Sequence, residues 1–420
     1  MASAHHPHRN ELRGRGYFNR LGPGLVTGAA DDDPSGIGTY SQVGASTGFA
    51  MLWSAPALLP FAIAVQEACA RLALANRAGL ARIIKRNFPR PVVLLAVLLI
   101  VIANTVNIAA DLASMSAALK LLVPIPQTLG VLVFTVVIAT TEILIPYHRY
   151  ARVLRWLCLS LIAYVAVLFT IHVDWFAVLH NVVWPHVTWD RTTWSACIAL
   201  AGTTISPYLF VWQAAEEVEE IQRESGIANI SRTHLWAMRI DVVAGMMSGV
   251  IIMFAIMVVT GTELHGAGIT SIASAEQAAA ALKPLAGQAA GLLFALGLLG
   301  VGLLAVPVLA GASAYAVAEL FDWPESLERK PSRAKAFYGV ILASMLIAFL
   351  LNLLQVNPMY ALFIAALTNG LAAPVLLFLI GILTSRDSVM GELRSGSWSR
   401  VFVFGTATLM AAAPVAWLFA

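Results

Sequence analysis

The sequence predicts an all-α polytopic membrane protein with eleven transmembrane helices. Of its 420 residues, 59% are hydrophobic and only 12% are charged, and the mean hydropathy is +0.79. These values exclude an ordinary soluble domain and a disordered chain. Segments of about 20 mostly apolar residues, long enough to cross a bilayer as a helix, recur along the chain. The predicted spans are 22–46, 49–74, 91–119, 128–146, 152–173, 192–219, 236–260, 287–317, 336–354, 358–384 and 400–419.

The positions of Lys and Arg support this number of spans, because cytoplasmic loops of membrane proteins are enriched in both. With a cytoplasmic N-terminus, all but three of the 26 basic residues fall on the inner side; the exceptions are Lys120, Arg191 and Lys283. A missed or additional span would destroy this asymmetry. The sequence therefore predicts an inside N-terminus and an outside C-terminus. The net charge of +3 is spread over separate loops, so no nucleic-acid partner is expected.

The domain organisation is predicted to be a single transmembrane transporter domain over residues 1–420, because no polar segment is long enough to form a second domain. We expect it to lie in a bacterial-type inner (plasma) membrane, with the lipid bilayer as its surroundings. The sequence does not set the oligomeric state, and a monomer is compatible with it. The predicted parts are a cytoplasmic tail (1–20), a first repeat (21–173), a second repeat (192–384) and an eleventh helix (399–420).

The first span is interrupted by Asp31-Asp32-Asp33-Pro34-Ser35-Gly36. A carboxylate at bilayer depth normally faces a cation or a water-filled path, and Pro and Gly free backbone groups that need partners inside the protein. The pattern indicates a cation site, with the three carboxylates at the C-terminal end of the first half-helix. The alternative is a proline kink with the aspartates at the membrane interface. A single acid such as Glu67 in the second span is expected to form a structural ion pair with a nearby Arg.

A second break, Gly202-Thr203-Thr204-Ile205-Ser206-Pro207-Tyr208, interrupts the sixth span. Transporters built from inverted repeats place such breaks at corresponding positions of their two halves. Five helices separate the starts of the halves, so spans one to five and six to ten form candidate repeats of opposite orientation. Unwound carbonyls and half-helix ends can coordinate a cation near the midplane.

Three segments, Gly22-Pro23-Gly24, Asp33-Pro34-Ser35-Gly36 and Ser206-Pro207-Tyr208, resemble the NRAMP family of divalent-metal transporters. In that family the first helix carries Asp-Pro-Gly-Asn and the sixth carries Met-Pro-His. The resemblance covers essentially the whole chain. It implies a LeuT-like fold, proton-linked uptake of divalent metal and alternating access around helices one and six. The metal is then the transported substrate, and no cofactor is expected.

The resemblance also implies a set of metal ligands. The metal-binding aspartate of the family falls on Asp33, and the backbone-carbonyl ligand falls on Thr203. Gly36 stands where the family has an asparagine ligand, and Ser206 stands where it has a thioether methionine. Losing the soft sulfur weakens discrimination against hard cations such as Mg²⁺. Losing the amide leaves room for a retained water, which is how Mg²⁺ is usually held.

Further polar residues are assigned to the surroundings of the metal or to its path. Asp31 and Asp32 are expected to bind metal-associated water, and Asn369 in the tenth span to reach the site from the second repeat. Tyr208 and Gln213 occupy the two histidine positions of the family. This pattern resembles the divergent NRAMP-related branch associated with magnesium.

Proton coupling is predicted to be weakened. Asp33 and Asp111 remain as candidate carriers of the proton pathway, but Ser114 replaces the third-helix glutamate of the family and both histidines are absent. The replacing side chains do not titrate near neutral pH. Uncoupled or weakly coupled transport follows.

The sequence thus predicts a secondary active transporter of divalent cations, Mn²⁺ and/or Mg²⁺. The alternative is a cation-coupled transporter of a small organic solute on the same fold, with Asp33 as counter-ion and Ser206 and Tyr208 shaping the pocket. A membrane enzyme is disfavoured, because the sequence shows no nucleophile and base pair, no metal-binding His cluster and no phosphate loop.

Overall fold

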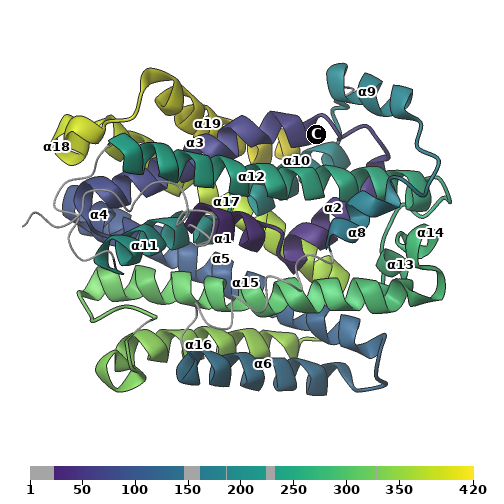
Figure 1. Ribbon diagram of the computed structural model, residues 1–420, viewed down its shortest axis with the longest axis horizontal. Coiled ribbons are helices and arrows are strands. Elements are labelled where there is room, and N and C mark those ends of the chain that lie inside the picture. The colour runs from purple at the N-terminus through teal and green to yellow at the C-terminus, as the bar shows by residue number, and fades with distance from the viewer. Residues whose placement is uncertain (1–22, 146–160, 186, 224–231, 328) are drawn as a thin grey trace, which may run out of the picture.

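The computed structural model describes residues 23–145, 161–185, 187–223, 232–327 and 329–420, and this part of the chain is helical without a strand (Figure 1). The helices of the first half are α1 (Pro23–Asp31), α2 (Pro34–Thr47), α3 (Ser54–Asn76), α4 (Leu80–Asn87), α5 (Arg90–Lys120), α6 (Gln127–Leu144), α8 (Ile162–Val167) and α9 (Trp175–Val183). Those of the second half are α10 (Arg191–Thr204), α11 (Pro207–Arg223), α12 (Arg232–Thr260), α13 (Ala275–Ala280), α14 (Lys283–Ala286), α15 (Ala290–Phe321), α16 (Lys335–Asn352), α17 (Pro358–Ser385), α18 (Asp387–Met390) and α19 (Ser397–Phe419). Short helical turns complete the list: η2 (Gly261–His265), η3 (Gly287–Ala289), η4 (Pro331–Arg333) and η5 (Gly391–Leu393).

Within the described residues, nine helical segments are long and apolar enough to cross a membrane. The predicted first span is not among them, because the break divides it into α1 and α2, of 9 and 14 residues. The first part of the predicted fifth span, 152–160, lies outside the described residues, and the rest contains only the short helix α8. The remaining predicted spans each correspond to one of the nine segments, so the all-α membrane class is confirmed.

Both breaks end at a proline that starts a new half-helix, Pro34 in α2 and Pro207 in α11. Proline is tolerated at the first position of a helix, because its missing N–H would have no partner there. A proline disfavours the helical region for the residue before it. Asp33 accordingly is extended, with φ −65° and ψ 171°. Other prolines lie inside continuous helices, namely Pro60, Pro307, Pro374 and Pro414. Proline alone therefore does not interrupt a span, but at the two breaks a proline begins the second half-helix.

Helix α1 lies against α12 at backbone distance. The Gly24 N–H donates to Asp241 Oδ2 at 2.5 Å. A Cβ on Gly28 would lie 2.3 Å from the carbonyl oxygen of Gly245, which is closer than real atoms approach. The absence of a side chain at Gly28 therefore allows the two helices to touch backbone to backbone.

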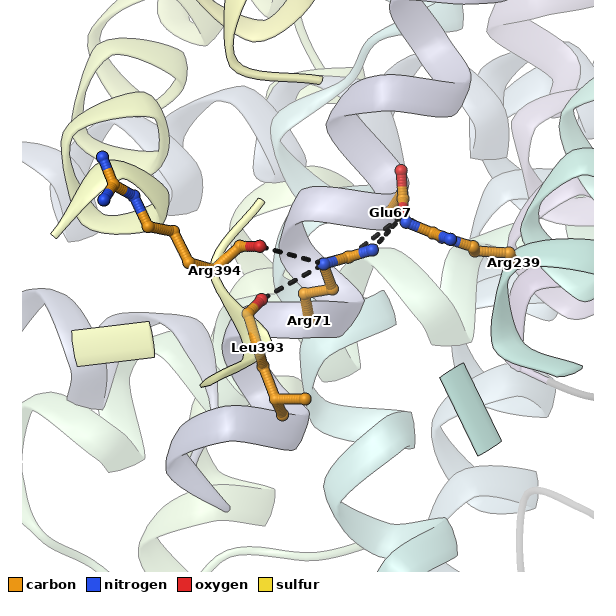
Figure 2. Close-up of polar contacts among 5 residues, drawn as sticks. All are labelled: Glu67, Arg71, Arg239, Leu393 and Arg394. Atoms are coloured by element: carbon orange, nitrogen blue, oxygen red, sulfur yellow. Dashed lines mark hydrogen bonds and ion pairs between the residues drawn. The ribbon is translucent and has the colours of Figure 1, made fainter. Parts of the chain in front are cut away.

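A charged cluster joins α3, α12 and the segment that precedes α19 (Figure 2). Glu67 Oε1 lies 2.9 Å from Arg71 Nη2 and 2.5 Å from Arg239 Nε. Arg71 Nη1 also donates to the carbonyls of Leu393 and Arg394, at 3.2 and 3.3 Å. The predicted structural ion pair of Glu67 is confirmed, and it has two arginine partners.

Candidate functional site

The two breaks meet in the interior of the protein. The Tyr208 hydroxyl, at the start of α11, donates to the carbonyl of Ala30 at 2.7 Å and lies 3.5 Å from Asp33 Oδ2. Asp33, Thr203, Ser206 and Tyr208 are each at most 1% exposed. The structure therefore brings the two interrupted helices together around a centre that is closed to solvent.

Asp33 caps the N-terminus of α2. Its Oδ1 accepts the Gly36 N–H and the Ser35 hydroxyl, both at 2.7 Å. The expectation that all three aspartates stand at the C-terminal end of α1 is therefore wrong for Asp33. Pro34 restarts the helix directly after Asp33, so this carboxylate faces the favourable end of the α2 dipole.

Asp31 is the last residue of α1, and Asp32 lies in the break. They are 1% and 4% exposed, and both oxygens of Asp31 and Oδ1 of Asp32 have no hydrogen-bond donor among the described residues. Asp31 Oδ2 lies beside α12, 3.0 Å from the position that a Cβ on Gly249 would occupy. Buried carboxylates without partners are costly and are usually kept for function.

In the second break, a side chain of the break itself forms hydrogen bonds with the freed backbone carbonyls. The Ser206 hydroxyl donates to the carbonyls of Gly202 and Thr203, at 2.6 and 2.8 Å. The two predicted ligands of this break, the Thr203 carbonyl and the Ser206 hydroxyl, are thus bonded to each other in this conformation. Thr203 Oγ1 is buried without a partner in the described part of the chain.

The space beside Gly36 is filled. A Cβ on Gly36 would lie 3.1 Å from the carbonyl oxygen of Asp31 and 3.3 Å from Thr203 Oγ1, which is already a tight contact. The expected room for a retained water at this position is therefore not present in this conformation. Its physical reason is the close packing of α2 against α10 and against the end of α1.

A third helix contributes the residue that connects the predicted site. Asn107 of α5 donates through Nδ2 to Asp33 Oδ2 at 2.9 Å and to Asp111 Oδ2 at 3.1 Å. Its Oδ1 accepts from Asn369 Nδ2 of α17 at 2.9 Å. Asp33, Asp111 and Asn369 were predicted from the sequence, whereas Asn107 was not. The signal was available, because residues four apart share one face of a helix.

Gln213 lies further along α11. Its Oε1 accepts from the Thr27 hydroxyl at 2.7 Å, and its Nε2 donates to Glu217 at 3.0 Å. These contacts connect α11 to α1 on the side of the breaks that the charge distribution predicts to be cytoplasmic. Gln213 is fully buried between the two half-helices, and its assignment to the path of the metal stays a prediction.

The described residues contain no group of three or more His, Cys, Asp or Glu side chains arranged to hold a metal ion. A cation at the breaks would therefore combine carboxylates with carbonyl, hydroxyl or amide oxygens. Such all-oxygen sets suit hard cations.

Comparison with known proteins gives a concordant result. The profile of the family described as "Natural resistance-associated macrophage protein-like" matches residues 24–420. A relative from Deinococcus radiodurans, named "Divalent metal cation transporter MntH", is 28% identical over 383 residues, covering 89% of this chain and 83% of the relative. One of the same name from Verminephrobacter eiseniae is 28% identical over 410 residues, covering 94% of this chain and 87% of the relative.

Solved structures show the same fold. A manganese transporter from Eremococcus coleocola aligns with a TM-score of 0.76 at 16% identity, covering 96% of this chain and 87% of that chain. Mhp1, a nucleobase-cation-symport-1 family transporter, aligns with a TM-score of 0.61 at 13% identity, covering 95% of this chain and 92% of that chain. The predicted LeuT-like fold is confirmed.

Proposed function

Because the chain belongs to the natural resistance-associated macrophage protein-like (Nramp) family of membrane transporters, we propose that it carries divalent metal cations, Mn²⁺ and Mg²⁺, across a bacterial inner membrane. The names of its relatives support a divalent cation as the substrate class. Transport proceeds by alternating access, with the cation held between the two breaks. The N-terminus is cytoplasmic and the C-terminus is outside.

The observation that carries this proposal is the environment of the Asp33 carboxylate. This group is buried, lies in an interrupted membrane helix, and accepts hydrogen bonds from Ser35, Gly36 and Asn107. All three donors are neutral, and Asp33 forms no ion pair within the described residues. Such donors favour the ionised carboxylate without cancelling its charge. A divalent cation is the partner that this arrangement lacks.

The chemistry of the surrounding atoms supports hard cations. The candidate ligands at the breaks are the Asp33 carboxylate, the Thr203 carbonyl and the Ser206 hydroxyl, and none of them is sulfur. Oxygen ligands suit Mg²⁺ and Mn²⁺, whereas a thioether would favour softer metals such as Cd²⁺. We therefore propose that Cd²⁺ is discriminated only weakly from Mg²⁺.

The proposed proton pathway is short. Asp33 and Asp111 are joined through Asn107, and Tyr208 and Gln213 stand where the related transporters carry histidines. A proton leaving Asp33 thus has one acidic neighbour along α5. We propose coupling that is weaker than one proton for each cation.

The test is uptake of Mn²⁺ and Mg²⁺ into proteoliposomes by the full chain and by Asp33→Ala. Uptake by Asp33→Ala is expected to fall to the level of liposomes without protein, because the charged ligand is gone. Asp174→Ala is the control, since Asp174 caps α9 away from the breaks, and its uptake is expected to match that of the unchanged protein. Undiminished uptake by Asp33→Ala would refute the proposal.

A further inference from the structure

The amide of Asn107 lies at the junction of three polar side chains. Its Nδ2 is 2.9 Å from Asp33 Oδ2 and 3.1 Å from Asp111 Oδ2, and its Oδ1 accepts from Asn369. Asn107, Asp111 and Asn369 are 0% exposed. One buried amide group therefore faces two carboxylates from different helices.

Two buried acceptors of this cluster have no donor. Asn369 Oδ1 and Asp111 Oδ1 are both without a hydrogen-bond partner in the described residues. Buried acceptors normally have at least one partner, so each orphan needs a physical explanation. The hydrogen bonds around Asn107 thus leave two buried oxygens without a donor in this conformation.

Rotating the side-chain amides of Asn107 and Asn369 by a half-turn, which exchanges oxygen and nitrogen, gives a second hydrogen-bond arrangement. The oxygen and nitrogen of an amide have nearly the same size and can exchange places. With Asn107 and Asn369 both turned, Asn107 Nδ2 donates to Asn369 Oδ1, which gains the partner it lacks. Asn107 Oδ1 then faces Asp33 Oδ2 and Asp111 Oδ2. Three oxygens in such a position repel one another unless a cation lies between them.

The distances fit a small divalent cation. After the turn, the Asn107 oxygen would lie 2.9 and 3.1 Å from the two carboxylate oxygens, at the places where Nδ2 is now. Mg²⁺ holds its oxygen ligands at about 2.0–2.1 Å in an octahedron, so neighbouring ligands are about 2.9 Å apart. The longer bonds of Ca²⁺ would require wider spacing. Little backbone movement is needed to form the site for Mg²⁺ or Mn²⁺.

We propose that Asn107 supplies from α5 the amide oxygen ligand that Gly36 cannot supply, in a divalent-cation site completed by Asp33 and Asp111. Asn369 holds the turned amide. This inference rests on the proposed function, and it places the bound cation toward α5 instead of between the two breaks alone. It also makes Asp111 a cation ligand.

The experiment is isothermal titration of the purified full-length protein with Mg²⁺ or Mn²⁺ alone. Asn107→Ala is expected to raise the Kd for both cations at least about tenfold, because even the loss of a residue that only orients a ligand costs about 10–100-fold. Asn104→Ala is the matched control on the same helix. Asn104 is equally buried but donates to Leu309 and Ser313 of α15, and its Kd is expected to be unchanged.

Asn107→Asp separates a ligand from a hydrogen-bond donor. A carboxylate offers an oxygen to the cation but cannot donate to Asp33 or Asp111. If Asn107 is a ligand of the cation, the Kd of Asn107→Asp for Mg²⁺ is expected to be equal to or lower than that of the unchanged protein. If Asn107 serves only as a donor, Asn107→Asp binds as weakly as Asn107→Ala or more weakly, and the inference is overturned.

The failure of this inference differs from failure of the proposed function. Undiminished uptake by Asp33→Ala contradicts the proposed function itself. Loss of uptake by Asp33→Ala, together with an unchanged Kd in Asn107→Ala, contradicts the α5 ligand only. If Asn107→Ala does not fold, the inference is tested with Asn107→Asp, by the rise in its melting temperature when Mg²⁺ is added. A rise equal to that of the unchanged protein supports the inference, and no rise overturns it.

Discussion

Two groups of acidic residues lie within the membrane helices, and the chain treats them in opposite ways. The Glu67 carboxylate is bound by the guanidinium groups of Arg71 and Arg239 (Figure 2). The Asp31 carboxylate in the first break has no donor among the described residues. The contrast teaches that the chain supplies cationic partners for Glu67, whereas among the described residues it supplies none for the buried carboxylate of Asp31.

Asp33 stands between these extremes. It accepts several hydrogen bonds, which fix its orientation, but all of its donors are neutral. None of these donors offsets a negative charge on Asp33, whereas two arginines do so at Glu67. The Asp33 carboxylate is thus held in one orientation before a cation binds, and its ionised form could still pair with that cation.

The largest effect on stability is expected for Arg71→Met. The change leaves Glu67 with Arg239 alone and removes the bonds to the carbonyls of Leu393 and Arg394. Because Glu67 keeps one cationic partner, the free energy of unfolding should fall by about 1.5–3 kcal/mol, the range for losing hydrogen bonds to a charged group. Thermal unfolding in detergent measures it, and the Kd for Mg²⁺ of the folded protein should not change. A weaker Kd would show that this cluster also serves binding, and the contrast would fail.

A smaller effect of opposite sign is expected for Asp31→Asn. Replacing an unpartnered buried charge by a neutral amide of the same shape should raise the free energy of unfolding by about 1 kcal/mol. The Kd for Mg²⁺ should rise about tenfold, as for a residue that acts on the metal through another ligand or a water. Melting curves and titration of the same preparation measure both. A loss of binding as complete as in Asp33→Ala would make Asp31 a direct ligand.

The smallest effect is expected for an acid outside the membrane. Asp190 caps α10, where the Thr188 hydroxyl and the Thr193 N–H lower the pKa of its carboxyl below the ordinary value. A lowered pKa in the folded state stabilises the protein above the ordinary carboxyl range, and this contribution is lost as the pH falls through the folded value. Asp190→Asn keeps the cap and should cost at most about 0.5 kcal/mol at neutral pH.

The pH dependence checks this expectation. Melting temperatures of Asp190→Asn and of the unchanged protein should converge as the pH falls below the ordinary range of a carboxyl. A difference that grows on acidification would show that the charge of Asp190 is unfavourable in the folded protein. Water and the neighbouring donors then would not stabilise the charge of this exposed acid, and Asp190 could not be contrasted with Glu67 and Asp31.

The sequence predicts the membrane helices and both breaks because those features depend on local chemistry. Apolar length defines a span, and at the two breaks Pro34 and Pro207 begin the second half-helix. The capping role of Asp33 was also predictable, since Asp before Pro and Ser is a usual helix start. Counting Asp33 with the end of the first half-helix misplaces this carboxylate, which caps the second half-helix.

The spacing of Asn107 and Asp111 places both on one face of α5, but the contact of Asn107 with the first break depends on tertiary structure. Its contact with Asp33 requires a particular rotation of α5 against a segment 74 positions earlier in the chain. A helix that is buried on several sides has no polar face to indicate that rotation. The packing at Gly36 is unpredictable for the same reason, because the Thr203 side chain reaches it from α10.

The backbone contact between Gly28 and Gly245 has a consequence for motion. No side chain separates α1 from α12 at this point, so there is no soft layer that could absorb a displacement of one against the other. Under the proposed alternating access, any swing of α1 would therefore have to carry the middle of α12 with it, because the two backbones touch at Gly28 and Gly245.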